Sequence, residues 1–300
     1  MALTGRQYAI AAGEFEATVV EVGAALRSFT HLAADVTASF GEDELPPRCC
    51  GGVLVPWPNR IRGGRYRFEG EDYQLPLTEP ARGNAIHGLA RWTRWSCVRH
   101  DADAVTLAYD IPPQTGWPFQ VMVELTYRLD VESGLAVTAT ARNLGVGRAP
   151  FGAGFHPYLA VDAGGLSEVS LQLPASQMFV TDDAQVPIGV RPVDRAHDFR
   201  RKRRLGATRM DAGFTDLDTV DGRGHALVHS GSGGARIWFD ETFGYLQVFT
   251  PDVLSHGRPA IAVEPMTCAP DAFNTGAGLI VLEPGGSWTG SWGITPAARA

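Results

Sequence analysis

Cysteine, long apolar runs and excess positive charge are all scarce in this 300-residue chain. Of its four cysteines, Cys49 and Cys50 are adjacent and cannot easily bridge each other, so we expect no disulfide framework. No uncharged apolar run reaches the roughly 18 residues that a membrane-spanning helix needs. The formal charge of −7 disfavours nucleic acid and anionic membranes as partners, because both attract clustered positive charge.

Signals for a cofactor or a metal are also lacking. The glycine-rich stretch 231–234 has neither the lysine nor the strand-turn-helix setting of a phosphate-binding loop. His225 and His229 are flanked by glycines and serines that predict a strand, in which four residues span about 13 Å, too far for joint chelation of a metal. We therefore expect no cofactor and no metal. With no secretory leader apparent, we expect a cytoplasmic monomer or homodimer that binds a small neutral or polar molecule.

Glycine and proline are plentiful, and their spread predicts an all-β fold. The 35 glycines and 20 prolines leave little room for long helices but suit short strands separated by turns. Apolar residues alternate from Val121 to Leu129, a turn follows at Glu132-Ser133-Gly134, and a second strand begins at Leu135. This pattern predicts a hairpin.

Similar strand-like runs recur at 16–22, 105–109, 235–239, 245–249 and 279–282. Their spacing is typical of a sandwich or a barrel. We find no fixed-period repeat and no low-complexity linker, so residues 1–300 are predicted to form a single domain.

Two segments offer groups for proton transfer. An apolar run from Ala260 is interpreted as a strand that ends at Glu264, just before Pro265, and a partly desolvated carboxylate there can have its pKa tuned for use as a base. His156 is followed by Pro157, which predicts that a strand ends at the histidine, where pockets form. One carboxylate and one imidazole suffice for paired acid and base catalysis.

Other segments have both a functional and a structural interpretation. Trp57 could stack on a sugar and Arg60 could bind hydroxyls, or the two could belong to a rigid loop. His87 precedes Gly88, where a ligand could approach the backbone, although a structural histidine is the commoner outcome. Asp211 could accept bonds from hydroxyls or serve a turn. The basic run Arg200–Arg204 could hold an anion or be a solvated loop.

Taken in order, five segments resemble the aldose 1-epimerase (galactose mutarotase) family. They are Asn59-Arg60-Ile61, Asn84-Ala85-Ile86-His87-Gly88, Gly154-Phe155-His156-Pro157-Tyr158, Met210-Asp211-Ala212-Gly213-Phe214, and Glu264-Pro265 through Pro270-Asp271-Ala272-Phe273-Asn274. The resemblance covers about residue 15 to the end. It implies a large antiparallel β-sandwich with a sugar bound in a cleft on one sheet.

The resemblance also implies roles for individual residues. Glu264 is the catalytic base and His156 the catalytic acid, while Arg60, His87 and Asp211 bind sugar hydroxyls; we add Trp57 and Phe155 as apolar walls. The expected reaction interconverts the α and β anomers of a hexose by ring opening and reclosure. It requires an ionised Glu264 and a protonated His156, so the surroundings of His156 must keep its pKa high enough for protonation. Two alternatives stay open: a hexose-6-phosphate 1-epimerase that uses the basic run for the phosphate, and a non-catalytic carbohydrate-binding module.

Overall fold

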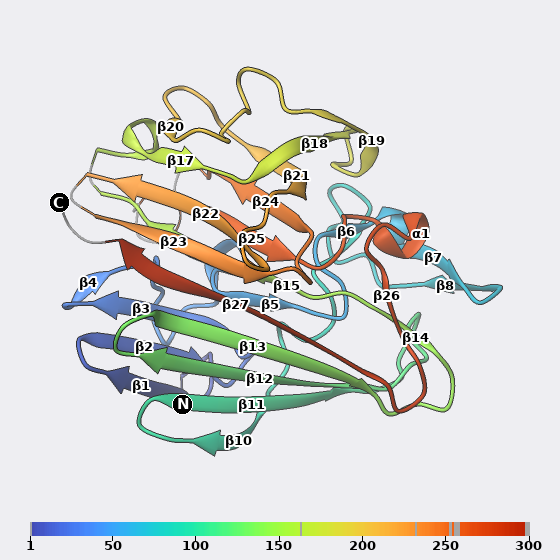
Figure 1. The fold of residues 1–300 in the computed structure, drawn as a ribbon. Coiled ribbons are helices and arrows are strands. Elements are labelled where there is room, and N and C mark those ends of the chain that lie inside the picture. The colour runs from blue at the N-terminus through green and yellow to red at the C-terminus, as the bar shows by residue number, and fades with distance from the viewer. Residues whose placement is uncertain (1, 163, 232, 252–253, 255–258, 298–300) are drawn as a thin grey trace.

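Two large antiparallel sheets organise the chain (Figure 1). The computed structural model describes residues 2–162, 164–231, 233–251, 254 and 259–297. Within them, the nine-stranded sheet has the order β10 (Ser96–His100), β11 (Ala104–Ile111), β12 (Val121–Asp130), β13 (Gly134–Asn143), β27 (Ser287–Ala297), β23 (Gly233–Asp240), β22 (Arg223–Ser230), β17 (Ser170–Gln172) and β20 (Arg203–Arg204). The all-β prediction is confirmed.

The eight-stranded sheet carries the residues of the candidate site. Its order is β19 (Pro187–Pro192), β18 (Ala175–Thr181), β21 (Asp211–Leu217), β24 (Tyr245–Phe249), β25 (Ala260–Met266), β15 (Gly154–His156) and β5 (Gly52–Leu54), and β16 (Tyr158–Ala160) also pairs with β25. The two sheets contribute to one apolar core, in which the ring of Phe155 on β15 lies 5.1 Å from that of Trp292 on β27. This packing is the predicted β-sandwich.

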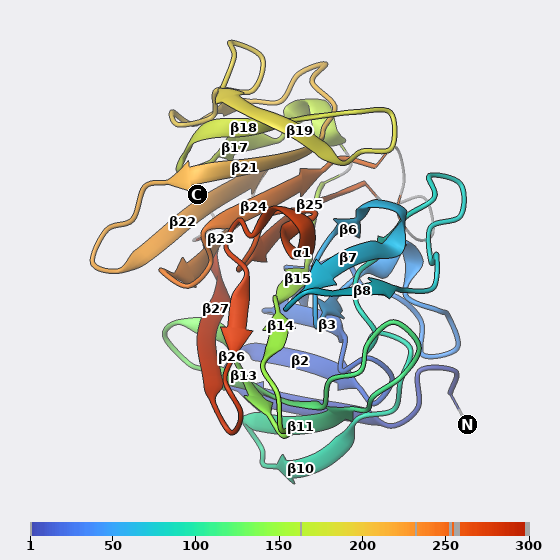
Figure 2. The ribbon, with the colours of Figure 1, turned by 90° about the vertical axis from the view of Figure 1, so that its right-hand side faces the viewer.

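Smaller elements flank the sandwich. They are a four-stranded sheet of β1 (Gln7–Ala12), β2 (Phe15–Val20), β3 (Leu26–His31) and β4 (Ala34–Asp35); the pairs β6 (Arg60–Ile61) with β9 (Ala85–Ile86), β7 (Arg65–Phe68) with β8 (Glu71–Gln74), and β14 (Ala149–Phe151) with β26 (Ile280–Leu282); the helix α1 (Ala272–Thr275); and the 3₁₀ turns η1 (Pro47–Cys49), η2 (Arg62–Gly64) and η3 (Leu166–Glu168). The helix α1 lies beside β6 and β7 (Figure 2). No helix in the described ranges has both the length and the apolar character needed to span a bilayer.

The predicted hairpin is formed by β12 and β13. Val121, Val123, Leu125, Tyr127 and Leu129 are all buried on one face of β12, as the period of two requires. The turn closes where Asp130 accepts hydrogen bonds from the backbone amides of residues 132 and 133. Each of the five strand-like runs also falls on an observed strand, namely β2, β11, β23, β24 and β26. The four cysteines are unpaired.

Candidate active site

A cavity of about 490 Å³ opens on the face of the eight-stranded sheet that points away from the sandwich core. Because successive side chains alternate across a strand, Ile261 and Val263 of β25 face the core, whereas Glu264 faces the cavity. The lining residues are Arg48, Cys49, Asn59, Arg60, Thr78, Glu79, Arg82, Ile86, His87, Arg91, His156, Asp211, Gln247, Phe249 and Glu264. Five of the six residues in the predicted site therefore share one cavity.

His156 and Glu264 lie side by side in this cavity. Imidazole Nε2 of His156 is 3.4 Å from carboxylate Oε1 of Glu264, and both side chains are almost fully buried. The strand β15 ends at His156, as the following proline predicts. The strand β25, however, continues past Glu264 to Met266, so the prediction that this strand ends at the carboxylate is wrong.

An interruption of the sheet explains how the pair comes together. On one side β25 pairs at Met266 with Gly154 of β15 and at Ala262 with Tyr158 of β16. No ladder pair joins residues 263–265 to those two strands in the part of the chain that the structure describes. Pro265, which has no amide hydrogen to donate, lies in this interval, where no ladder bond is needed. His156 occupies the same interval.

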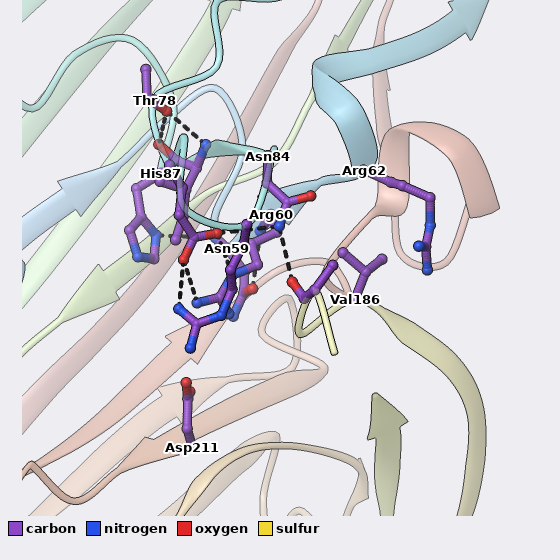
Figure 3. Close-up of polar contacts among 12 residues, drawn as sticks. Asn59, Arg60, Arg62, Thr78, Asn84, His87, Val186 and Asp211 are labelled. Carbon is purple, nitrogen blue, oxygen red and sulfur yellow. Dashed lines mark hydrogen bonds and ion pairs between the residues drawn. The ribbon is translucent and has the colours of Figure 1, made fainter. Parts of the chain in front are cut away.

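The opposite side of β25 keeps its register and adds polar groups. Gln247 of β24 lies directly across from Glu264. Its side-chain amide donates a 2.7 Å hydrogen bond to Oδ1 of Asp211 on β21. Asp211 is exposed at the cavity and lies across this cavity from Arg60 and His87 (Figure 3). The sheet register thus aligns Asp211, Gln247 and Glu264 on one face.

Arg60 lies on β6, and His87 directly follows β9, the strand that pairs with β6. The backbone amide of Asn59 donates to Nδ1 of His87 at 3.2 Å, and the amide of His87 donates to the carbonyl of Asn59 at 2.9 Å. Burial lowers the pKa of His87 well below its usual value, and His156, Arg91 and Arg60 add to this effect. A neutral His87 with Nδ1 occupied carries its proton on Nε2, which makes it a hydrogen-bond donor.

Burial also sets the protonation of the central pair. It raises the pKa of Glu264 well above the usual value, with a further contribution from Asp211 and opposition from Arg60. It lowers the pKa of His156 to about 3, and Arg91 acts in the same direction. Both effects favour the neutral forms of the two groups, a protonated Glu264 and a neutral imidazole. These directions are opposite to those that the predicted combination of an ionised Glu264 and a protonated His156 requires, so the predicted protonation of the pair stays a prediction.

Two predicted aromatic walls are buried elsewhere. Trp57 is 2% exposed, and its ring packs against Trp117 and Phe273 in the core rather than lining the cavity. Phe155 points into the sandwich, because it precedes His156 on β15 and the two side chains take opposite faces. The apolar part of the lining comes instead from Ile86 and Phe249.

Neither Gly88 nor the basic run Arg200–Arg204 lines this cavity. Gly88 has a positive φ and leaves room for the backbone of Val55, so its lack of a side chain serves chain packing and not ligand approach. In the basic run, Arg200 pairs with Asp198 and Arg204 with Glu168, and no residue of the run lines the cavity. His225 and His229 lie on the strand β22, and no metal-binding group of three His, Cys, Asp or Glu side chains occurs among the described residues.

Several cavity residues were missed by the sequence analysis. Gln247 is recognisable only from the register that sets it opposite Glu264, and Glu79 only from its contact with Arg60. Backbone conformation gives another signal, because non-glycine residues rarely adopt a positive φ. Arg48, Cys49, Asn59 and His87 do so, and all four line the cavity.

Fold and site together define a β-sandwich protein with a charged cavity and a buried carboxylate–imidazole pair. The chain belongs to the aldose 1-epimerase family, whose family model matches residues 6–295. It is 35% identical over 291 residues to YihR, an uncharacterized protein of Escherichia coli (strain K12). The matched region covers 95% of this chain and 91% of YihR.

Solved structures share the fold. The GalM/aldose epimerase homologue of C. elegans has a TM-score of 0.86 at 18% identity and covers 98% of this chain and 99% of its own. Galactose 1-epimerase of Lactobacillus acidophilus NCFM has a TM-score of 0.79 at 21% identity and covers 96% of this chain and 92% of its own. These likenesses confirm the predicted fold class, and the family model confirms the predicted family.

Proposed function

We propose that the protein interconverts the α and β anomers of a hexose by acid–base ring opening and reclosure. The observation that carries this proposal is the 3.4 Å contact between His156 Nε2 and Glu264 Oε1 inside one cavity. The two sugar oxygens that exchange protons, the C1 hydroxyl and the ring oxygen, are bonded to the same carbon. A base and an acid that act on them must therefore lie close together, as this pair does.

The pair holds one proton and can carry it through a complete cycle. With Glu264 ionised and His156 protonated, Glu264 takes the proton of the C1 hydroxyl while His156 gives one to the ring oxygen, and the C1–O5 bond breaks to give the aldehyde. This step leaves Glu264 protonated and His156 neutral, which is the state that burial favours. After rotation about C1–C2, the same groups act in reverse and close the ring to the other anomer.

The remaining polar groups are proposed to hold the sugar. Arg60 and the neutral His87 donate hydrogen bonds to hydroxyls, and Asp211 accepts them. Phe249 offers an apolar face for the C–H side of the ring. We further propose that no metal or nucleotide takes part, because each positioned proton transfer is worth about 10²–10⁴ in rate.

Measurement of anomer exchange in freshly dissolved α-glucose and α-galactose tests the proposal, by polarimetry or by NMR. Glu264→Gln and His156→Asn should each abolish most of the exchange. Glu168→Gln and His225→Asn, which change the same residue types outside the cavity, should keep it. If exchange matches that of buffer for every aldose tested, the non-catalytic carbohydrate-binding module becomes the better explanation.

One observation favours an anionic hexose as a second candidate substrate. Arg48 and Arg91 line the cavity, and neither forms an ion pair with a carboxylate in the described part of the chain. Two such guanidinium groups suit a phosphate or another anion bound in this cavity, which the basic run does not line. Phosphorylated and sulfonated hexoses should then compete more strongly than neutral hexoses, and the advantage should shrink as salt is added. Equal competition would exclude this candidate.

A further inference from the structure

Glu79 lies behind Arg60 and is the centre of a hydrogen-bond cluster. Its carboxylate accepts from Arg60 Nε at 2.8 Å and from Arg60 Nη2 at 2.9 Å. It also accepts from Arg82 Nη1 at 3.0 Å and from Asn84 Nδ2 at 3.2 Å. The side chain of Glu79 is only 15% exposed. One partly buried carboxylate therefore receives donors from three residues, of which Arg60 and Arg82 also line the cavity.

The two bonds from Arg60 fix the orientation of its guanidinium. A bidentate contact to Nε and Nη2 holds the planar group in one rotational setting, which a single bond cannot do. The Nη1 group is not used by Glu79 and stays available as a donor in the cavity that Asp211 and Glu264 also line. Arg60 is thus presented to a ligand in a preset geometry.

Asn84 extends the same cluster to the turn between β18 and β19. While one of its amide hydrogens goes to Glu79, another is donated to the carbonyl of Ala184 at 2.9 Å. The backbones of Glu79 and Asn84 are also bridged to each other. Arg62, two residues after Arg60, points away from this group (Figure 3) and pairs with Asp182. Glu79 consequently connects Arg60 to the outer turn of the eight-stranded sheet.

We propose that Glu79 is a positioning residue for anomer exchange: it holds Arg60 against the substrate and offsets the charge of Arg60 beside Glu264. The inference rests on the proposed function. It assigns a role to a carboxylate that lines the cavity without belonging to the acid–base pair.

The charge balance gives this role a measurable consequence. Arg60 lowers the pKa of Glu264, and Glu79 carries the carboxylate bonded directly to Arg60. Removing the charge of Glu79 leaves the positive charge of Arg60 uncompensated, which favours the ionised form of Glu264. The other charged or titratable groups around Glu264 remain in place; they are His156, Asp211, Cys49, Tyr158, His87, Arg48, Arg82 and Arg91.

The test compares Glu79→Gln with Glu21→Gln in the full-length protein. Glu21 is a matched control, because it is 18% exposed, forms a 2.6 Å ion pair with Arg94 and does not line the cavity. We expect Glu79→Gln to raise KM for the best aldose about tenfold and to change kcat less. The acidic limb of its kcat/KM profile should move to lower pH. Glu21→Gln should keep the wild-type KM and pH profile.

A double variant separates positioning from general destabilisation. If Glu79 acts through Arg60, then adding Glu79→Gln to Arg60→Ala should change KM by much less than it does alone. Full additivity of the two changes, or a Glu79→Gln variant with the KM and pH profile of Glu21→Gln, would show that Glu79 is only structural. Either result leaves the proposed function standing if the wild-type protein exchanges anomers. A wild-type protein without exchange overturns both proposals.

Discussion

Replacing His156 by asparagine should remove an acid-sensitive contribution from the stability of the protein. Burial lowers the pKa of this imidazole from 6.5 to about 3 in the folded state. Between these values the unfolded chain binds a proton that the folded chain does not. Stability from this group is therefore present above pH 6.5 and is lost as the pH falls toward about 3.

The size of the effect follows from the two pKa values. Each pH unit within the window costs about 1.4 kcal/mol, so at about pH 4.5 the wild-type protein has lost roughly 3 kcal/mol through His156. His156→Asn carries no such group. Whatever its stability relative to the wild type at neutral pH, that difference should shift by roughly 3 kcal/mol in favour of the variant at about pH 4.5.

Urea unfolding at several pH values measures this shift. Phe155→Leu is the matched control, because it alters the neighbouring buried side chain on β15 without removing a titratable group. Its stability difference from the wild type should stay nearly constant with pH. If the curves of His156→Asn and the wild type run parallel from neutral pH to about pH 4.5, the imidazole is not held neutral by burial and the argument is wrong.

Three further changes test the remaining parts of the site. Glu264→Gln should lower kcat by about 10²–10⁴. Because burial raises the pKa of Glu264 above 4.5, the wild-type protein loses stability as the pH rises through the folded pKa. The stability of the variant relative to the wild type, measured by urea titration, should therefore increase from acid toward neutral pH. Arg60→Ala should chiefly raise KM in steady-state kinetics, because Arg60 is proposed to bind substrate and moves no proton. Trp57→Ala should cost about 3–5 kcal/mol of unfolding free energy while the folded fraction keeps its KM, since the indole lies in the core and not in the cavity.

Local sequence patterns were sufficient for the strands and for one half of the acid–base pair. Alternation from Val121 to Leu129 predicted β12 because one buried face imposes a period of two. Pro157 predicted that β15 ends at His156, since proline lacks the amide that a ladder requires. Both predictions needed only the chain near the residue concerned.

Side-chain direction and long-range contacts were beyond such patterns. Trp57 lies three residues before Arg60, yet one side chain enters the core and the other lines the cavity. The sequence shows that this segment is irregular but not which way each of its side chains points. The contact of Glu79 with Arg60 joins residues 19 positions apart, and Gln247 becomes relevant only through the register of β24 with β25.

The wrong prediction at Glu264 shows what a proline does when its neighbouring strand is incomplete. Pro265 was taken to end the strand, because a proline inside a sheet normally leaves a ladder bond unmade. In the structure the facing chain is itself interrupted between Gly154 and Tyr158, so the missing amide of Pro265 has no partner to lose. Pro157 causes the matching break on that facing chain. Pro157 therefore opens a gap in which Pro265 is tolerated, and in this gap the imidazole of His156 lies 3.4 Å from the carboxylate of Glu264.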